Sequence, residues 1–150
     1  MKLSIILVIS FEKPQLVSDA LAAVFASRTD FRFEVIVVDN ASTAAATALA
    51  PFAARLQVIR NRENLGFTKA NNRGVAAAQG EYLLFLNSDT RIGPDTLSLL
   101  VGFADAHPHI SQFGQAKFVA QALGIRHQPV PVQQPEACRL ATQKQIFGDG

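Results

Sequence analysis

The sequence is poor in cysteine and has no run of like charges, and both shortages narrow what the protein can be. Its 150 residues include a single cysteine, Cys138, so an internal disulfide is excluded and a reducing compartment is the expectation. The 14 basic and 12 acidic residues are interspersed, giving a net charge of +2. Nothing in this pattern indicates a nucleic-acid partner or an anionic membrane as partner.

Long hydrophobic runs are also missing. The apolar stretch from Leu3 to Ile9, interrupted only by Ser4, is too short to cross a bilayer, and no small-residue cleavage site follows it. We therefore interpret it as a first buried strand. We expect a cytoplasmic protein, with peripheral attachment to the inner face of the membrane as the alternative.

Glycine is missing where two common nucleotide-binding loops need it. No glycine occurs between Ile9 and Pro14, which excludes the Gly-x-Gly-x-x-Gly fingerprint, and no Gly-Lys-Ser/Thr motif occurs anywhere. Rossmann dehydrogenases and P-loop NTPases are therefore disfavoured. A nucleotidyltransferase of related architecture is disfavoured too, because its Gly-rich, Arg/Lys-containing loop should follow the first strand.

What the chain does have is an apolar content of 49% and an alternation of strand and helix patterns. A single domain of this length can bury roughly 70% of the surface that its unfolded chain exposes. The alternation predicts an α/β fold, a parallel sheet with helices on both faces. Leu16 and Val17 are predicted to face the core from the first helix. Pro51 is predicted to end the second helix early, and the fourth strand is predicted to be buried. The predicted strands are 3–9, 33–38, 56–60 and 82–86, and the predicted helices are 14–25, 44–54, 67–78 and 94–106.

The pattern weakens beyond Pro108. Gln, Pro and Ala dominate residues 112–145, and residues 128–135 favour extended or polyproline conformation. The fold is therefore predicted only to about residue 110. His107-Pro108-His109 is more typical of an exposed turn than of a metal site, and His127 has no partner at ligand spacing.

Each predicted strand is followed by a cluster of polar residues. The carboxyl ends of parallel strands lie at one edge of a sheet, where open α/β folds place their ligands. Any one cluster could be only a polar loop, but their joint placement favours a ligand site. The clusters are Ser10-Phe11-Glu12, Asp39-Asn40-Ala41-Ser42, Asn61-Arg62-Glu63-Asn64 and Asn87-Ser88-Asp89-Thr90.

Two carboxylates in these clusters have chemistry that suits a nucleotide. Asp89 is a hard oxygen ligand suited to Mg²⁺ or Mn²⁺ held jointly with a substrate's phosphates, although it could instead cap the turn before Pro94. Asp39 can accept a hydrogen bond from a base N–H or a ribose hydroxyl.

Four ordered motifs carry a resemblance to a known family. They look like the amino-terminal half of family 2 glycosyltransferases of the GT-A fold, and most resemble the rhamnosyltransferase-like enzymes of cell-surface polysaccharide synthesis. The resemblance covers about residues 2–110 and implies a Rossmann-like GT-A sheet. The motifs are Val37-Val38-Asp39-Asn40-Ala41-Ser42, Asn61-Arg62-Glu63-Asn64-Leu65-Gly66-Phe67, Asn71-Asn72-Arg73-Gly74 and Gly80 to Thr90.

The resemblance implies a site for a nucleotide-diphosphate sugar, UDP- or dTDP-linked, with a saccharide or lipid-linked acceptor. Asp39 would contact the base, Asn64 and Gly66 would shape the base and ribose pocket, and Asp89 would bind the metal and the diphosphate. Asn87 stands where the family's Asp-x-Asp motif has its first carboxylate. Lys69 and Arg73 could approach phosphates, although an exposed helix face is favoured. The predicted donor-binding residues are Ser10, Glu12, Asp39, Asn40, Asn64, Gly66, Asn71, Asn87, Ser88 and Asp89.

The first strand ends in Ser10-Phe11-Glu12, where the family usually has an Asn-Tyr-Asn or Tyr-Asn-Arg type of turn, so an acid is placed near the nucleotide. Inverting members also use a carboxylate base from an acceptor-binding half beyond the Asp-x-Asp region. The only acids after residue 110 are Glu136 and Asp149, so the base is predicted to be missing and the catalytic residue is unknown.

We therefore expect a donor-binding domain over residues 1–110 and a Gln/Pro-rich tail or truncated acceptor part over 111–150. Such a chain would be a truncated, frame-altered or excised glycosyltransferase. The alternative is a non-catalytic module that holds a nucleotide sugar or pairs with another chain, including a second copy of itself, through uncovered sheet edges.

Overall fold

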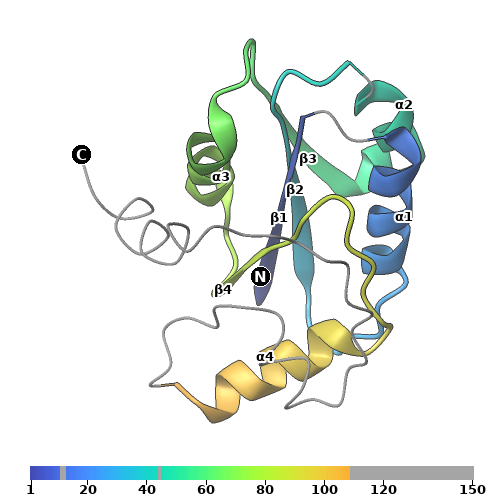
Figure 1. Ribbon diagram of the computed structural model, residues 1–150. Coiled ribbons are helices and arrows are strands. Elements are labelled where there is room, and N and C mark those ends of the chain that lie inside the picture. The colour runs from blue at the N-terminus through green and yellow to red at the C-terminus, as the bar shows by residue number, and fades with distance from the viewer. Residues whose placement is uncertain (11–12, 44, 109–150) are drawn as a thin grey trace, which may run out of the picture. The chain divides into compact units, whose positions relative to one another are not determined.

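The computed structural model describes residues 1–10, 13–43 and 45–108 (Figure 1). Its first compact unit, Met1–Val101, holds all the described strands and is the unit discussed below. The elements follow in the order β1 Leu3–Ile9, α1 Pro14–Phe25, β2 Phe33–Asp39, α2 Ala45–Leu49, the 3₁₀ helix η1 Ala50–Arg55, β3 Leu56–Arg60, α3 Gly66–Ala77, β4 Tyr82–Phe85 and α4 Thr96–Ala106.

The strands form one parallel sheet in the order β3-β2-β1-β4. The central strand β1 is buried along its whole length and pairs with β2 from Leu3 opposite Phe33 to Ile9 opposite Asp39. Because every strand runs the same way, all four carboxyl ends lie at one edge of the sheet. This edge carries the polar clusters described above.

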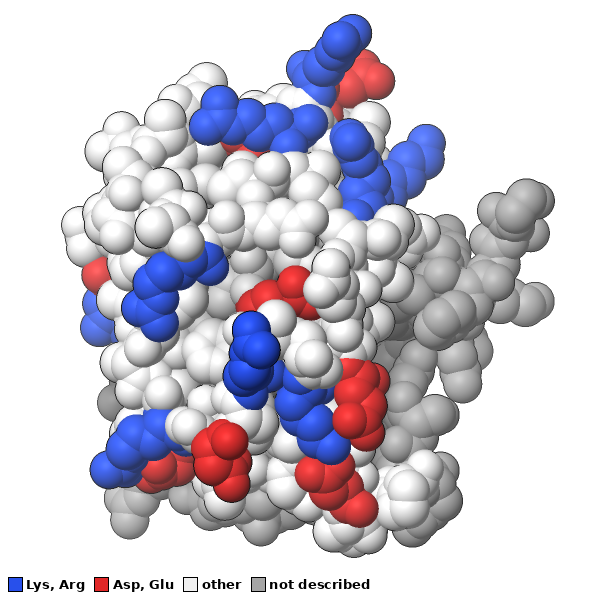
Figure 2. Space-filling model, turned by 180° about the vertical axis from the view of Figure 1, so that it is seen from behind, with Lys and Arg blue, Asp and Glu red and all other residues white. Residues whose placement is uncertain are grey.

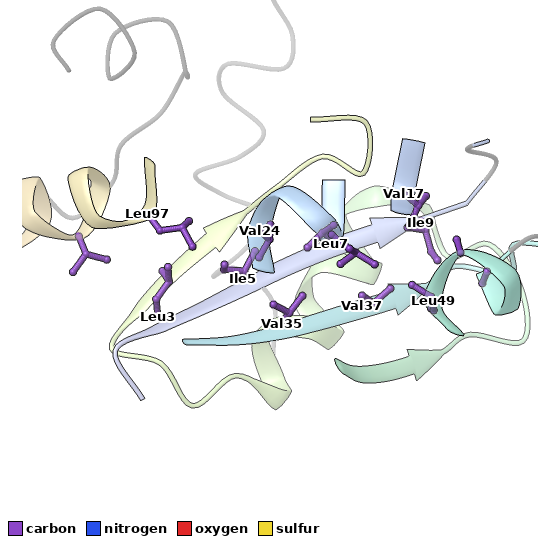
Figure 3. Close-up of a cluster of buried hydrophobic side chains, with 14 residues drawn as sticks. Leu3, Ile5, Leu7, Ile9, Val17, Val24, Val35, Val37, Leu49 and Leu97 are labelled. Carbon is purple, nitrogen blue, oxygen red and sulfur yellow. The ribbon is translucent and has the colours of Figure 1, made fainter. Parts of the chain in front are cut away.

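Both faces of the sheet are covered, as the alternation predicts. One face packs β1 and β2 side chains against α1, α2 and Leu97 (Figure 3). The other face packs Ile6, Val8, Ile36 and Val38 against Ala70 of α3. Alternate residues of each strand point to opposite faces, so two separate apolar clusters form from the same strands.

Helix α3 lies close to the sheet because residue 74 is a glycine. A Cβ built on Gly74 would lie 2.6 Å from Cγ2 of Ile6 and 3.3 Å from Cγ2 of Val38. No larger residue fits without displacing these buried branched side chains.

The predicted element bounds agree closely with the structure, and the second helix breaks as expected. It ends at Leu49, and Pro51 lies in the first turn of η1, where its missing N–H costs no helical hydrogen bond. Ser42 lies before α2, and its Oγ accepts a hydrogen bond from the N–H of Ala45, the first residue of the helix, at 3.1 Å.

Two burial predictions are wrong. Residues 82–86 do not form a buried strand: β4 ends at Phe85 and is an edge strand of the described sheet, so Leu83 and Phe85 are 40% and 39% exposed. Leu16 is 41% exposed, because Val17, Ala20, Leu21 and Val24 already make up the buried stripe of α1.

On the face opposite to the view of Figure 1, separate groups of lysine and arginine lie among aspartate and glutamate on a surface made mostly of other residues (Figure 2). None of the helices in the described part of the chain is long and apolar enough to cross a membrane.

Candidate functional site

A pocket of about 430 Å³ lies at the carboxyl edge of the sheet. Residues from the ends of all four strands contribute to it, either directly or through the loops that follow. This volume is in the usual range for small-molecule sites. The lining residues are Val8, Ser10, Asn40, Asn64, Gly66, Phe67, Asn87, Ser88 and Asp89.

Most of the predicted donor-binding residues therefore lie together, but Asp39 and Asn71 do not line this pocket. Asp39 is 6% exposed, and its Oδ1 accepts a hydrogen bond from the Ser42 N–H at 2.8 Å. Asn71 is 5% exposed, and its Nδ2 donates to the Phe67 carbonyl at 3.0 Å. Glu12 lies outside the described residues.

The turn after β2 is held in an uncommon conformation. Ala41 has a φ of 64°, in the left-handed region that residues with a Cβ seldom adopt. The hydrogen bond from Ser42 to Asp39 closes the turn around it. In this structure Asp39 therefore shapes the backbone that presents Asn40 to the pocket.

Three asparagine amides connect the ends of β2 and β3 to the loop before α3. Asn40, 2% exposed, donates from Nδ2 to Asn64 Oδ1 at 2.7 Å. Its own Oδ1 accepts from Asn61 Nδ2 at 2.8 Å and from the Leu65 N–H at 3.0 Å. We call Asn61, Asn40 and Asn64 the amide chain.

The end of the amide chain fixes the start of α3. Asn64 Oδ1 accepts a second hydrogen bond, from the Gly66 N–H at 2.9 Å. Gly66 has a φ of +78°, and a Cβ there would meet nothing within 4 Å, so the backbone conformation rather than space favours glycine. The loop can thus turn sharply into the helix while Gly66 still faces the pocket.

The opposite wall of the pocket is the turn that carries Asp89. The Thr90 N–H donates to the Asn87 carbonyl at 3.1 Å, Ser88 is buried and Asp89 is exposed. Asp89 is the acidic residue among those that line the pocket. Within the described ranges no group of three or more His, Cys, Asp or Glu side chains could hold a metal by itself.

An ion pair ties this turn to α1. The Arg91 guanidinium pairs with Asp19, whose other partner is Gln15 Nε2 at 2.7 Å. The hydrogen bonds from Gln15 and Arg91 lower the pKa of the Asp19 carboxyl below its ordinary value.

Val8 and Phe67 were not predicted to line the site, and Arg73 was predicted to lie on an exposed helix face. Val8 and Phe67 line the pocket, and Phe67 is 63% exposed although it is aromatic. Arg73 donates from Nη1 to Asn61 Oδ1. The signal available for Phe67 was its place directly after Gly66 in the second motif, but the Arg73 to Asn61 contact has no signature in the sequence.

Comparison with curated proteins finds glycosyltransferases over much of the chain. An uncharacterized glycosyltransferase of Haemophilus influenzae is 26% identical over 132 residues, which are 86% of this chain and 45% of that protein. The succinoglycan biosynthesis protein ExoO of Rhizobium meliloti is 37% identical over 75 residues, 49% of this chain and 22% of that protein. The chain therefore spans less than half of the length of these relatives.

Comparison with solved structures finds the same architecture. S. aureus TarS 1-349 in complex with UDP-GlcNAc has a TM-score of 0.62 and 30% identity, covering 72% of this chain and 32% of that chain. The mannosyltransferase PcManGT of Pyrobaculum calidifontis, in complex with GDP-Man and Mn²⁺, has a TM-score of 0.59 and 23% identity, covering 69% and 32%, and supports the fold alone. The profile of Glycosyl transferase family 2 matches residues 4–146, and with the GT-A architecture of the sheet this shows that the chain belongs to that family.

Proposed function

We propose that the pocket binds the donor of a glycosyl transfer, a nucleotide-diphosphate sugar, together with a divalent cation. The observation that carries this proposal is the convergence of Asn64 and Gly66 with Asn87, Ser88 and Asp89 on one pocket at the carboxyl edge. The TarS structure, which contains UDP-GlcNAc, supports a UDP-linked donor.

The residue types on the Asp89 side of the pocket suit a hard cation. Asn87, Ser88 and Asp89 offer an amide, a hydroxyl and a carboxylate oxygen, which are ligand types that Mg²⁺ and Mn²⁺ accept. With one carboxylate, the site needs the diphosphate to complete the coordination. The cation would neutralise the charge that develops on the departing diphosphate.

Asp39, the neighbour of the pocket-lining Asn40, is proposed to contact the base. Its Oδ1 is engaged by the Ser42 N–H, and its second oxygen remains as the acceptor for a base N–H. In the Asp39→Asn variant, UDP should bind more weakly by about 1.5–3 kcal/mol, with a smaller change for GDP. Equal binding of both nucleotides by the variant and the parent would make this carboxylate structural only.

For the whole protein we propose sugar transfer in cell-surface polysaccharide synthesis, with a saccharide or lipid-linked acceptor. The R. meliloti relative is a succinoglycan biosynthesis protein, which supports this class of product. We propose that residues 1–110 hold the donor. The only acids after residue 110 are Glu136 and Asp149, in a Pro- and Gln-rich segment, so we propose that the general base is missing and that the 150-residue chain alone does not transfer sugar at the rate of a full-length relative. The rhamnosyltransferase-like subgroup remains a prediction.

The test is calorimetry of UDP and dTDP binding, with Mn²⁺ and with chelator. The parent should bind more tightly with Mn²⁺, and Asp89→Ala should lose that difference. Asp30→Ala is the matched control, because Asp30 is an exposed acid before β2, at the other edge of the sheet. If Asp89→Ala keeps the full metal dependence, the cation site is misplaced.

A second arm separates donor binding from catalysis. The purified chain is incubated with labelled UDP-glucose or dTDP-rhamnose and with free-sugar and lipid-linked acceptors. Binding without transfer fits a donor domain, and sustained transfer that survives Glu136→Ala together with Asp149→Ala would show that the base lies elsewhere in this chain.

A further inference from the structure

The amide chain has a direction, and that direction is set by groups that can only donate hydrogen bonds. An asparagine amide can be turned by 180°, which exchanges its oxygen and nitrogen, so its orientation depends on its neighbours. Here each amide oxygen accepts from an obligate donor. Asn61 Oδ1 accepts from the Arg73 guanidinium, Asn40 Oδ1 from the Leu65 N–H and Asn64 Oδ1 from the Gly66 N–H.

The amide nitrogens consequently all point the same way along the chain. Asn61 Nδ2 donates to Asn40, and Asn40 Nδ2 donates to Asn64. Asn64 Oδ1 accepts from both Asn40 Nδ2 and the Gly66 N–H, so Asn64 Nδ2 is the end of the amide chain. Within the described part of the chain no residue accepts a hydrogen bond from that Nδ2, and Asn64 lines the pocket.

The cation at the start of this chain lies outside the pocket. Arg73 is exposed, is on the third turn of α3 and is not among the lining residues. Asn61 and Asn40, which connect it to Asn64, are 7% and 2% exposed. In such buried surroundings a polar network with a single allowed orientation is held more firmly than one exposed to water.

We propose that Arg73 is a positioning residue for the donor pocket. The Leu65 and Gly66 N–H groups fix which way Asn40 and Asn64 are turned, and Arg73 holds Asn61 in place at the other end of the amide chain, so that the Asn64 Nδ2–H₂ group is kept in position as a hydrogen-bond donor to the nucleoside part of the ligand. The inference rests on the proposed function. The strand order places Asn64, after β3, and Asp89, after β4, at opposite ends of the sheet edge. If Asp89 holds the diphosphate with its cation, Asn64 faces the nucleoside, whose carbonyl and ribose oxygens are acceptors.

The test is UDP binding by calorimetry in a double-mutant cycle of Arg73→Met and Asn64→Ala. Arg73→Met should weaken UDP binding about three- to tenfold, the usual range for losing the alignment of one hydrogen bond. In the Asn64→Ala background, Arg73→Met should not weaken UDP binding further, because the amide chain has then lost the Nδ2 group that donates to the ligand. Arg73→Lys keeps an obligate donor and should restore binding to within about twofold of the parent.

Two controls separate a positioning role from simpler ones. Arg60→Met removes another exposed positive charge, at the end of β3, and should leave UDP binding unchanged. Pyrophosphate binding should be the same in the parent and in Arg73→Met, because the proposed contact is to the nucleoside. A loss of pyrophosphate binding would instead assign Arg73 to the phosphates.

The position of the Asn64 side chain can also be tested without ligand, by NMR, so that this test does not depend on the UDP affinity. In ¹⁵N–¹H spectra the side-chain amide signals of Asn64, identified by their loss in Asn64→Ala, should shift in Arg73→Met and stay in place in Arg60→Met. The positioning role alone is overturned if Arg73→Met binds UDP as tightly as the parent does. It is also overturned if Arg73→Met weakens UDP binding equally in the parent and in Asn64→Ala. Failure of the parent to bind any nucleotide diphosphate overturns the proposed function and this inference with it.

Discussion

The two ends of the sheet both bury polar groups, yet they use them differently. At the amino ends, the Gly80 N–H donates to Ser4 Oγ at 2.7 Å and the Ser4 hydroxyl donates to Glu34 Oε1 at 2.6 Å. That carboxylate also accepts from the Gln79 N–H at 2.7 Å. This chain of hydrogen bonds ends in a group that only accepts, so it is closed within the protein.

At the carboxyl ends, Arg73 donates to Asn61, the first member of the amide chain, and the chain ends at Asn64, which lines the pocket. Buried polar residues alone therefore do not mark a binding site, since Ser4 is 0% exposed and belongs to the closed end. We propose that the candidate site is distinguished by a hydrogen-bond network that ends at the pocket, with the Asn64 Nδ2 group available to a ligand. The predictions below test whether the closed end controls stability alone and the open end controls both stability and binding.

The largest expected effect is at the closed end. In Gly80→Ala, the new Cβ would lie 2.4 Å from Ser4 N and 2.7 Å from Leu3 C, which are backbone atoms of the central strand. Because these atoms cannot move aside, we expect urea denaturation to show a loss of about 3 kcal/mol in the free energy of unfolding. The UDP affinity of the folded variant should be unchanged.

The matched control for that prediction is Gly93→Ala, where the nearest atom to the added Cβ is Thr96 Oγ1 at 3.5 Å, an ordinary contact. Its stability should stay close to that of the parent. A Gly80→Ala protein as stable as Gly93→Ala would mean that the chain before β4 shifts freely, and the closed end would not be the rigid part of the sheet.

The next effect compares one deletion at each end. Asn40→Ala removes the acceptor of the Asn61 amide and of the Leu65 N–H, and Ser4→Ala removes the acceptor of the Gly80 N–H. Each should cost about 1–3 kcal/mol of stability, because buried partners lose their hydrogen bonds. Only Asn40→Ala should also weaken UDP binding, by about tenfold. Comparable weakening in Ser4→Ala would abolish the distinction between the two ends.

A smaller effect is expected at the strained turn after β2. Glycine accepts the left-handed conformation of residue 41 without the steric cost that alanine carries, although it has more freedom to lose on folding. Ala41→Gly should therefore raise the free energy of unfolding by about 0.5–1 kcal/mol in thermal or urea denaturation. The reciprocal change, Gly66→Ala at φ +78°, should lower it by about 1 kcal/mol. Changes of the same sign in both variants would contradict this account.

The smallest effect is a dependence on pH. The folded-state pKa of Asp19 is lowered by Gln15 and Arg91, so its contribution to stability is present above its unfolded pKa of about 4. That contribution is lost as the pH falls through the lower folded-state value. Melting temperatures measured across this acidic range should therefore fall less steeply in Arg91→Gln than in the parent, and identical slopes would show that this exposed pair has no measurable role.

Much of the fold could be predicted from the sequence, because the local pattern of apolar residues indicates which face of each strand or helix is buried. The apolar run Leu3–Ile9 and the helical spacing from Val17 to Val24 each reflect the face that an element buries, and the structure confirms both elements. The polar residues after each strand could be assigned to one edge, because parallel strands bring their ends together. The sequence by itself thus determined the α/β class, the edge that carries the pocket and most of the residues that line it.

The tertiary structure decided which polar residues face the pocket and which support it. Asp39 lies in the same cluster as Asn40, but it does not line the pocket, and its Oδ1 accepts a hydrogen bond from the Ser42 N–H. Arg73 contacts Asn61 from another element, and Gly80 contacts Ser4 across 76 positions of the chain. Hydrogen-bond partners such as these come from segments that only packing brings together, so no local pattern of residues encodes them.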